Sequence, residues 1–546
     1  MNFSRVMAPD MSAPKRYSHR RGGMPVLVYF SLLLAPISLF VGAAIGFLNT
    51  GCRPRLAPAV AEGAALLALF GALISAAVLI LTGPVVTPVF AGMSVRLDAV
   101  SATMMFLVTF VGWVVARYSR TYLDGEARQG PFTGWLCLTL AAVLLLVTAG
   151  NLLQLVLAWI ATSLFLHRLL LFYPDRVAAQ RAARKKFITA RAGDVALVVA
   201  AALLMAAYGS DDIGSILKAA HAGEGGMLGT AAAAFLAVAA MLKSAQFPTH
   251  GWLTEVMETP TPVSALLHAG LINAGGFLVI RFANVLLLSP SVLSMLTIVG
   301  GFTALFGSLV MLTQPMVKTS LAWSTVSQMG FMIFECGLAL FPLALLHIVA
   351  HSLYKSHSFL ASGSAVERVA SIHRPGLIAS PDAGAVRRAF AAALAIYVLA
   401  GLGFGLTHKS PQAIALGAIL IFGIAYMLAQ GFADAAPRAL TRHTAAYAIA
   451  TSAGYFALQA GASSLTASIL PATPPPSPLE WALIALAVIS FGLTAAAQAM
   501  FPLWAYHPAA AGFRVHLSNG LYVNAVFDRI VGGWSTTGRA LNRPKL

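Results

Sequence analysis

Lysines and histidines inside long apolar stretches are the residues of this sequence best suited to chemistry. Lys243 ends the run GTAAAAFLAVAAMLK, and Pro248 follows in SAQFPTH. An ionisable side chain costs about 2.5–3.5 kcal/mol on insertion into hydrocarbon, so it is retained mainly beside a protein interior or a hydrated path. Proline lacks the amide hydrogen that a helix needs, so we expect a helix break at Pro248 with free carbonyl groups beside the ammonium. Lys243 is therefore a candidate proton carrier, the alternative being that it extends to a membrane interface.

Histidines mark two further segments. His268 lies two turns into PTPVSALLHAGLINAGGF, and histidine is suited to relaying protons because it titrates in the physiological range. A neutral, hydrogen-bonded core histidine is the alternative. His347, His351 and Lys355 follow one another at i, i+4 steps in HIVAHSLYKSHSF, so they line one stripe of one helix. Two imidazoles and an ammonium in that arrangement indicate a proton relay.

Other ionisable residues near these segments have possible supporting roles. The accessory candidates are His347, His357, Glu255, Glu258 and Lys409. Glu255 and Glu258 lie beyond the helix break, where they could pair with Lys243 or with a basic loop. Lys318 is either a second relay member or an ordinary charge at a helix end. Lys409 follows a glycine-rich run at 401–405 that could unwind its helix, and simple solvation of Lys409 is the alternative.

Metal and cofactor chemistry is not expected in this chain. A zinc site at the histidine pair lacks a carboxylate or cysteine ligand, and the neighbouring lysine would oppose a cation. Cys52, Cys137 and Cys336 have no metal-ligand or disulfide spacing and indicate small core residues. The sequence contains no phosphate-binding loop, dinucleotide fingerprint or nucleophile elbow. We therefore expect neither a cofactor nor enzymatic activity in the chain itself.

The composition predicts an all-α polytopic membrane protein. Of its 546 residues, 59% are hydrophobic and 10% are charged, and the mean hydropathy is +0.81. A soluble fold could not shield that much apolar surface, whereas a spanning helix needs about 20 apolar residues. Fifteen such windows occur, and the first, from Val26 to Phe47, is long for a cleaved leader. The expected segments are a basic tail (1–25), N-terminal helices (26–120), a central region (121–286 and 287–435), C-terminal helices (436–505) and an amphipathic tail (506–546).

Charge distribution predicts the orientation in the cell membrane. Lys and Arg number 35 against 18 Asp and Glu, for a net charge of +17. Basic loops retained in the cytoplasm explain this excess better than nucleic-acid binding does. The most basic segment, 176–191, is expected to be a cytoplasmic loop, with the amphipathic tail at the same face. Fifteen spans then place the basic N-terminus outside the cell, which conflicts with the rule that basic segments stay in the cytoplasm.

Three segments together resemble a known family. MLKSAQFPTHGWLTEVMETPTPVSALLHAGLINAGGFLVIR, VKTSLAWSTVSQMGFM and HIVAHSLYKSHSFLASGS are similar to helices of the proton-conducting antiporter-like subunits of respiratory complex I, Mrp-type antiporters and related hydrogenases. The resemblance runs from about residue 95 to 365. It implies two inverted five-helix repeats, each with a broken helix, over helices four to eight and nine to thirteen. The matching path residues are Lys243, His268, Lys318, His351 and Lys355.

Departures from that family pattern narrow the resemblance. Ile160 stands where the family has a glutamate after the tryptophan of the fifth helix, and Lys409 is only a counterpart in position for the second broken-helix lysine. A long lateral helix is not expected. The chain is thus most similar to the shorter membrane subunits of inorganic-carbon accumulation complexes. This implies a peripheral partner that resembles a zinc β-carbonic anhydrase.

The resemblance implies a proton- or cation-conducting subunit. Ion flux through it would drive the partner to hydrate CO2 to bicarbonate in one direction, with zinc in the partner and not in this chain. Two alternatives remain open at this point. One is an antiporter-like subunit of a complex I, hydrogenase or Mrp-type complex, and the other is a non-conducting membrane anchor for a peripheral enzyme.

Overall fold

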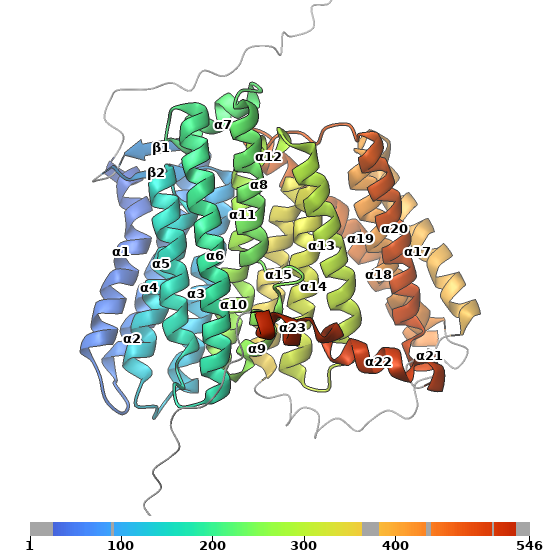
Figure 1. The fold of residues 1–546 in the computed structure, drawn as a ribbon, viewed down its shortest axis with the longest axis horizontal. Coiled ribbons are helices and arrows are strands. Elements are labelled where there is room, and N and C mark those ends of the chain that lie inside the picture. Colours follow the sequence, from blue (N-terminus) through green and yellow to red (C-terminus); the bar gives the residue numbers. More distant parts are fainter. Residues whose placement is uncertain (1–25, 89–91, 363–381, 433–437, 505–506, 531–546) are drawn as a thin grey trace, which may run out of the picture.

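Helices that run antiparallel between two faces make up nearly all of the computed structural model, which describes residues 26–88, 92–362, 382–432, 438–504 and 507–530 (Figure 1). Eleven described helices meet both the length and the hydropathy needed to cross a membrane. Four further long helices, α1, α14, α15 and α19, lie beside them and have 21 to 29 residues. The expected all-α polytopic fold is thereby confirmed.

The N-terminal part packs three long helices beside a small hairpin. These elements are α1 (Val26–Leu48), α2 (Leu56–Thr82), β1 (Val85–Pro88), β2 (Ser94–Leu97) and α3 (Ala99–Tyr122). The strands pair antiparallel, with Val85 opposite Leu97. Asp98 ends the hairpin and begins α3, because its carboxylate accepts a hydrogen bond from the Ser101 amide in a capping box. Cys52, expected in the core, is exposed between α1 and α2, whereas Cys137 and Cys336 are buried.

The first five-helix group contains two interrupted helices. It comprises α4 (Gln129–Val147), α5 (Leu152–Leu170), α6 (Val177–Tyr208), α8 (Gly226–Lys243) continued by α9 (Gly251–Glu255), and α10 (Thr261–Ala269) continued by α11 (Ala274–Arg281). The short elements α7 (Ile213–His221), η1 (Val256–Glu258), η2 (Leu271–Asn273) and α12 (Ala283–Leu287) connect them. The interruptions of α8 and α10 bring non-helical backbone into the bundle, where protein groups can satisfy it.

The second group also has five helices, and its fourth helix ends in a glycine-rich turn. It comprises α13 (Pro290–Met311), α14 (Val317–Gly337), α15 (Phe341–Ala361), α17 (Ala383–Gly403) with η4 (Leu406–His408), and α18 (Pro411–Gly431). The expected unwinding at the glycine run occurs here, since α17 ends at Gly403 and Gly405 has φ +71°. Glycines also let α13 and α14 touch backbone to backbone: a Cβ on Gly330 would lie 2.5 Å from the Ala304 amide nitrogen.

The C-terminal part adds two long helices and a strap. The elements are α19 (Arg438–Thr466), α20 (Pro478–Ala499), α21 (Phe501–Trp504), η5 (Pro508–Ala510), α22 (Ala511–Ser518), η6 (Gly520–Tyr522) and α23 (Val523–Ile530). We call residues 508–530 the C-terminal strap, because it crosses the bundle from α21 to α9 (Figure 1). Gln314 donates a hydrogen bond to the Ser518 carbonyl oxygen at 3.2 Å, which fixes the strap against the end of α13.

One face of the bundle, where α3 ends and α6, α14 and α19 begin, is called the basic face below (Figure 1). The interpretation of 176–191 as a loop at this face is wrong, because α6 begins at Val177 and includes almost the whole segment. Lys185 and Lys186 are buried in α6. Ala, Arg, Lys and Gln favour a helix here, and the two lysines can be buried because distant acids and a hydroxyl pair with them.

Candidate proton path

Lys243 is the last residue of α8, directly before the helix break. The break starts at Ser244, earlier than expected from Pro248, because Ala245 adopts φ +49°. The Ser244 hydroxyl donates to the Ile272 carbonyl oxygen at 3.0 Å and holds the unwound segment against η2. The Lys243 ammonium lies 4.4 Å from the centre of the Trp159 ring. The negative end of the α8 dipole and the ring face both stabilise a cation there.

A small cavity adjoins this ammonium. Two lysines, Lys186 of α6 and Lys243, line it together with Trp159 and Trp252. On the α10 side the lining is apolar and includes Leu267, the residue before His268. The cavity thus joins the lysines of the first repeat to the helix that carries the first histidine.

The acid near Lys243 comes from α6. Asp194 interacts electrostatically with Lys243, Arg191 and Lys186, and its carboxylate is 2.6 Å from the Arg191 guanidinium. Ile160, at the position of the family glutamate, is partly buried and carries no charge. The sequence interpretation missed Lys186 because it assigned segment 176–191 to a loop, and it gave no role to Asp194, which follows that segment. The available signal was the Arg191–Asp194 spacing of three residues at the start of an uninterrupted apolar run.

Lys186 is held inside the bundle by α5. Its ammonium donates to the Ser163 carbonyl oxygen at 2.8 Å and to the Ser163 hydroxyl at 2.9 Å. Both partners are neutral, so the positive charge of Lys186 is solvated by dipoles and opposed by Lys243 nearby. Two buried lysines thus face one carboxylate. Loss of a proton from either ammonium group would remove the repulsion between the two lysines.

Lys185 forms a separate ion cluster closer to the basic face. Its ammonium is 2.7 Å from a Glu255 carboxylate oxygen and 2.6 Å from an Asp528 carboxylate oxygen of the strap. Glu258 lies 3.4 Å from Arg176. The two glutamates therefore pair with the basic segment 176–191 and not with Lys243. Asp528 was not among the predicted residues.

His268 lies where the two repeats meet. Its ring stacks on Phe359 with 4.4 Å between ring centres, and neither ring nitrogen hydrogen-bonds another described residue. Asn273, one turn along, donates to the Ser352 hydroxyl of α15 at 2.8 Å. Buried imidazole nitrogens without a protein partner are typical of positions that water completes.

The stripe on α15 continues from this point. Lys355 is fully buried and donates to the Ser324 hydroxyl of α14 at 2.7 Å. His351 interacts electrostatically with His347, Lys355 and His268. His347 is 3.0 Å from a Glu335 carboxylate oxygen. The predicted i, i+4 stripe thus forms one connected group with His268, and Glu335 is an addition that the sequence interpretation missed.

Three predicted residues lie outside this group. His357 is exposed on another side of α15. Lys318 is partly exposed in the first turn of α14, two turns before the Ser324 that binds Lys355. Lys409 lies in the turn before α18, 5.5 Å from the Phe456 ring, where partial burial lowers its pKa. In the described part of the chain, no three His, Cys, Asp or Glu side chains are grouped to hold a metal ion.

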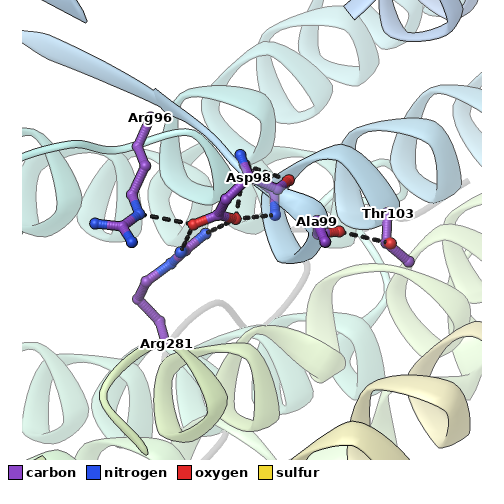
Figure 2. Close-up of polar contacts among 6 residues, drawn as sticks. Arg96, Asp98, Ala99, Thr103 and Arg281 are labelled. Carbon is purple, nitrogen blue, oxygen red and sulfur yellow. Dashed lines mark hydrogen bonds and ion pairs between the residues drawn. The ribbon is translucent and has the colours of Figure 1, made fainter. Parts of the chain in front are cut away.

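An ion triad fixes the outer end of the first repeat (Figure 2). Asp98 accepts hydrogen bonds from Arg96 of β2 at 2.7 Å and from Arg281 of α11 at 2.5 Å. Burial would raise the pKa of Asp98, but the guanidiniums of Arg281 and Arg96 hold it well below its usual range. The triad ties the hairpin, α3 and α11 together at the end of the helix that begins near His268.

The fold and the buried ammonium and imidazole groups define a multi-pass inner-membrane protein of the antiporter-like class. Residues 149–407 match the family model "NADH:quinone oxidoreductase/Mrp antiporter, TM", and residues 87–133 match the model of the complex I chain 5 N-terminus. The chain belongs to the branch of this family that contains the DabB inorganic carbon transporter subunits. It is 37% identical to the probable inorganic carbon transporter subunit DabB2 of Halothiobacillus neapolitanus over 94% of both chains.

Other relatives agree with this assignment. The chain is 47% identical to the probable inorganic carbon transporter subunit DabB of Hydrogenovibrio crunogenus over 50% of its own length and 54% of the length of that protein. Among solved structures, the Mrp complex of Dietzia sp. DQ12-45-1b superposes with a TM-score of 0.59 at 22% identity, over 93% of this chain and 59% of that chain. The archaeal membrane-bound sulfane sulfur reductase gives a TM-score of 0.56 at 16% identity, over 92% and 99%. These two likenesses concern the fold alone.

Proposed function

We propose that this chain conducts protons across the membrane and couples their flow to inorganic-carbon uptake. The proposal depends on one observation above all: buried ammonium and imidazole groups occur in both repeats. Lys186 and Lys243 line a small cavity that reaches the residue before His268, and His268 interacts electrostatically with His351 and Lys355. Such groups are expensive inside a membrane unless they exchange protons along a hydrated route. The similarity to DabB subunits supports inorganic carbon as the coupled process.

Lys318 belongs to this path as its end at the basic face. It precedes Ser324 on α14, and Ser324 holds the Lys355 ammonium. We assign the basic face to the cytoplasm from its excess of Lys and Arg. A proton moving inward down about 100 mV releases about 2.3 kcal/mol, enough to bias a coupled reaction roughly fifty-fold.

The coupled reaction belongs to a partner. Hydration of CO2 requires a metal-bound hydroxide, and the described residues group no metal ligands. We propose a peripheral zinc subunit similar to carbonic anhydrase, of the DabA type, which hydrates CO2 to bicarbonate on the cytoplasmic side. Copurification with this chain followed by zinc analysis of the bound protein tests that assignment.

Lysine variants test conduction. The chain is coexpressed with its partner in cells that lack carbonic anhydrase, and accumulation of labelled inorganic carbon is measured with and without an uncoupler. We expect Lys243→Ala and Lys355→Ala to reduce accumulation to the level of cells without the complex. Lys218→Ala, a change of an exposed lysine on α7, should leave it unchanged. Full, uncoupler-resistant accumulation in the first two variants would show that the chain is a non-conducting anchor.

A further inference from the structure

Glu335 is a buried carboxylate that the path described above does not explain. It lies two residues before the end of α14, and only 5% of its side chain is exposed. Its neighbours in sequence are apolar, in FMIFECG, and the His347 ring contacts Phe331 of the same helix. A carboxylate in such surroundings is retained against a large desolvation penalty, so its presence calls for a function.

A purely structural role is weakly supported. Glu335 binds His347 of the next helix at 3.0 Å, but α14 and α15 are already joined by a three-residue turn. That turn has its own hydrogen bonds, including one from the Leu340 amide to the Glu335 carbonyl oxygen at 3.0 Å. The Glu335 side chain is therefore not needed to bring these two helices together.

The position of Glu335 places it at one end of the α15 stripe. α14 runs away from the basic face and α15 returns toward it (Figure 1). His347 is thus nearest the opposite face, and His351 and Lys355 follow at successive turns, about 6 Å apart along the axis. The His347 and His351 rings have centres 6.1 Å apart, a gap that one water can bridge. His347 Nε2 and both His351 nitrogens are buried without a hydrogen bond to another described residue.

A second polar group near Glu335 comes from a C-terminal helix. Tyr455 of α19 interacts electrostatically with Glu335 and with Tyr397 of α17. Its hydroxyl is buried and makes no hydrogen bond to a described residue. Phe456, the next residue, lies under the Lys409 ammonium in the turn at that face. The groups that face Glu335 are therefore an imidazole on α15 and a phenol on α19, with the Cys336 thiol beside it on its own helix.

We infer that Glu335 is a proton-carrying residue, the carboxylate through which protons enter the His347, His351 and Lys355 row from the outer compartment. In one transfer, the protonated carboxyl group gives its proton to His347, which becomes an imidazolium, and the carboxylate is then reprotonated by a hydronium ion from the outer compartment, which leaves water. The imidazolium passes a proton to His351 and returns to its neutral form. The inference rests on the proposed function, which it extends by naming the outer entry residue.

Isosteric and conservative variants test this role in the full complex. Glu335→Gln preserves size and hydrogen bonding to His347 but carries no proton, and we expect accumulation to fall about a hundredfold or more. Glu335→Asp keeps the carboxyl group and should recover a substantial part of the rate. The matched control is Glu480→Gln on α20, because Glu480 is also buried but acts in a capping box, which glutamine preserves. Size-exclusion chromatography verifies that each variant assembles.

The outcomes separate the inference from the proposed function. Wild-type accumulation in assembled Glu335→Gln, together with loss in Lys355→Ala, would overturn the entry role and leave conduction intact. Equal loss in Glu335→Gln and Glu335→Asp would also overturn it, because a requirement for the glutamate shape is structural. Uncoupler-resistant accumulation in the wild type would refute the proposed function itself.

Discussion

Replacing Asp194 with asparagine removes the only carboxylate known to face Lys243 among the described residues. At 2.6 Å and an effective dielectric constant of about 20, the Arg191–Asp194 attraction alone is about 6 kcal/mol. Desolvation offsets part of that, and breaking a buried pair from one side costs about 3–5 kcal/mol. Arg191, Lys186 and Lys243 would then face one another without an anion. Since 1.36 kcal/mol corresponds to a factor of ten in an equilibrium constant, a cost of about 3–5 kcal/mol corresponds to about two to four powers of ten in that constant.

Accumulation of labelled inorganic carbon by the coexpressed complex measures the effect. We expect Asp194→Asn to lower the initial rate about a hundredfold or more, while Asp382→Asn, which changes an exposed helix cap that asparagine also serves, has no effect. A carboxylate returned to α5 by Ile160→Glu should restore part of the rate to Asp194→Asn. A wild-type rate in assembled Asp194→Asn would refute the reasoning that α6 supplies the acid for Lys243.

Two further predictions concern stability. Asp98→Asn leaves Arg281 buried without its anion, so the free energy of unfolding should fall by about 3–5 kcal/mol in a detergent melt. The pKa of Asp98 is depressed in the folded state, so its contribution is complete above the unfolded value near 4 and the deficit should be equal at pH 5 and pH 8; a deficit that vanishes at pH 5 would contradict this. Gly275→Ala would push a methyl group into the Ser244 hydroxyl and the Ala240 carbonyl oxygen, and we expect a loss of about 1–3 kcal/mol. Gly454→Ala, which meets open space, is its control, and equal melting temperatures for the two variants would exclude tight packing at Gly275.

Features that depend only on residues close together in the chain could be predicted from the sequence. The stripe of His347, His351 and Lys355 was visible because helical periodicity alone places i, i+4 residues on one side. The break after α8 was visible because proline and a neighbouring lysine stand in an otherwise apolar stretch. Its start could not be placed, because it depends on Ser244 and Phe247 binding Ile272 and Thr303 in other helices.

Features that depend on distant partners could not be predicted. The basic segment 176–191 has the charge expected of a cytoplasmic loop, although it is rich in the helix formers Ala, Arg, Lys and Gln. Its two lysines can be buried because Lys185 pairs with Glu255 and Asp528 and Lys186 donates to Ser163. Nothing within the segment indicates these partners. Glu335 was overlooked for a similar reason, since a single acid in FMIFECG gains meaning only once His347 is known to face it. In both cases, pairing with distant residues decides whether the charged side chain can be buried.

The pairing of Lys185 with Asp528 has a consequence for biosynthesis. Asp528 is translated after every described spanning helix, so Lys185 enters the membrane long before its second counter-ion exists. During that interval Glu255 alone balances its charge, and the site is complete only when the strap has been made and docked. A chain that stops before the strap therefore carries a buried ammonium with one counter-ion fewer than the finished protein.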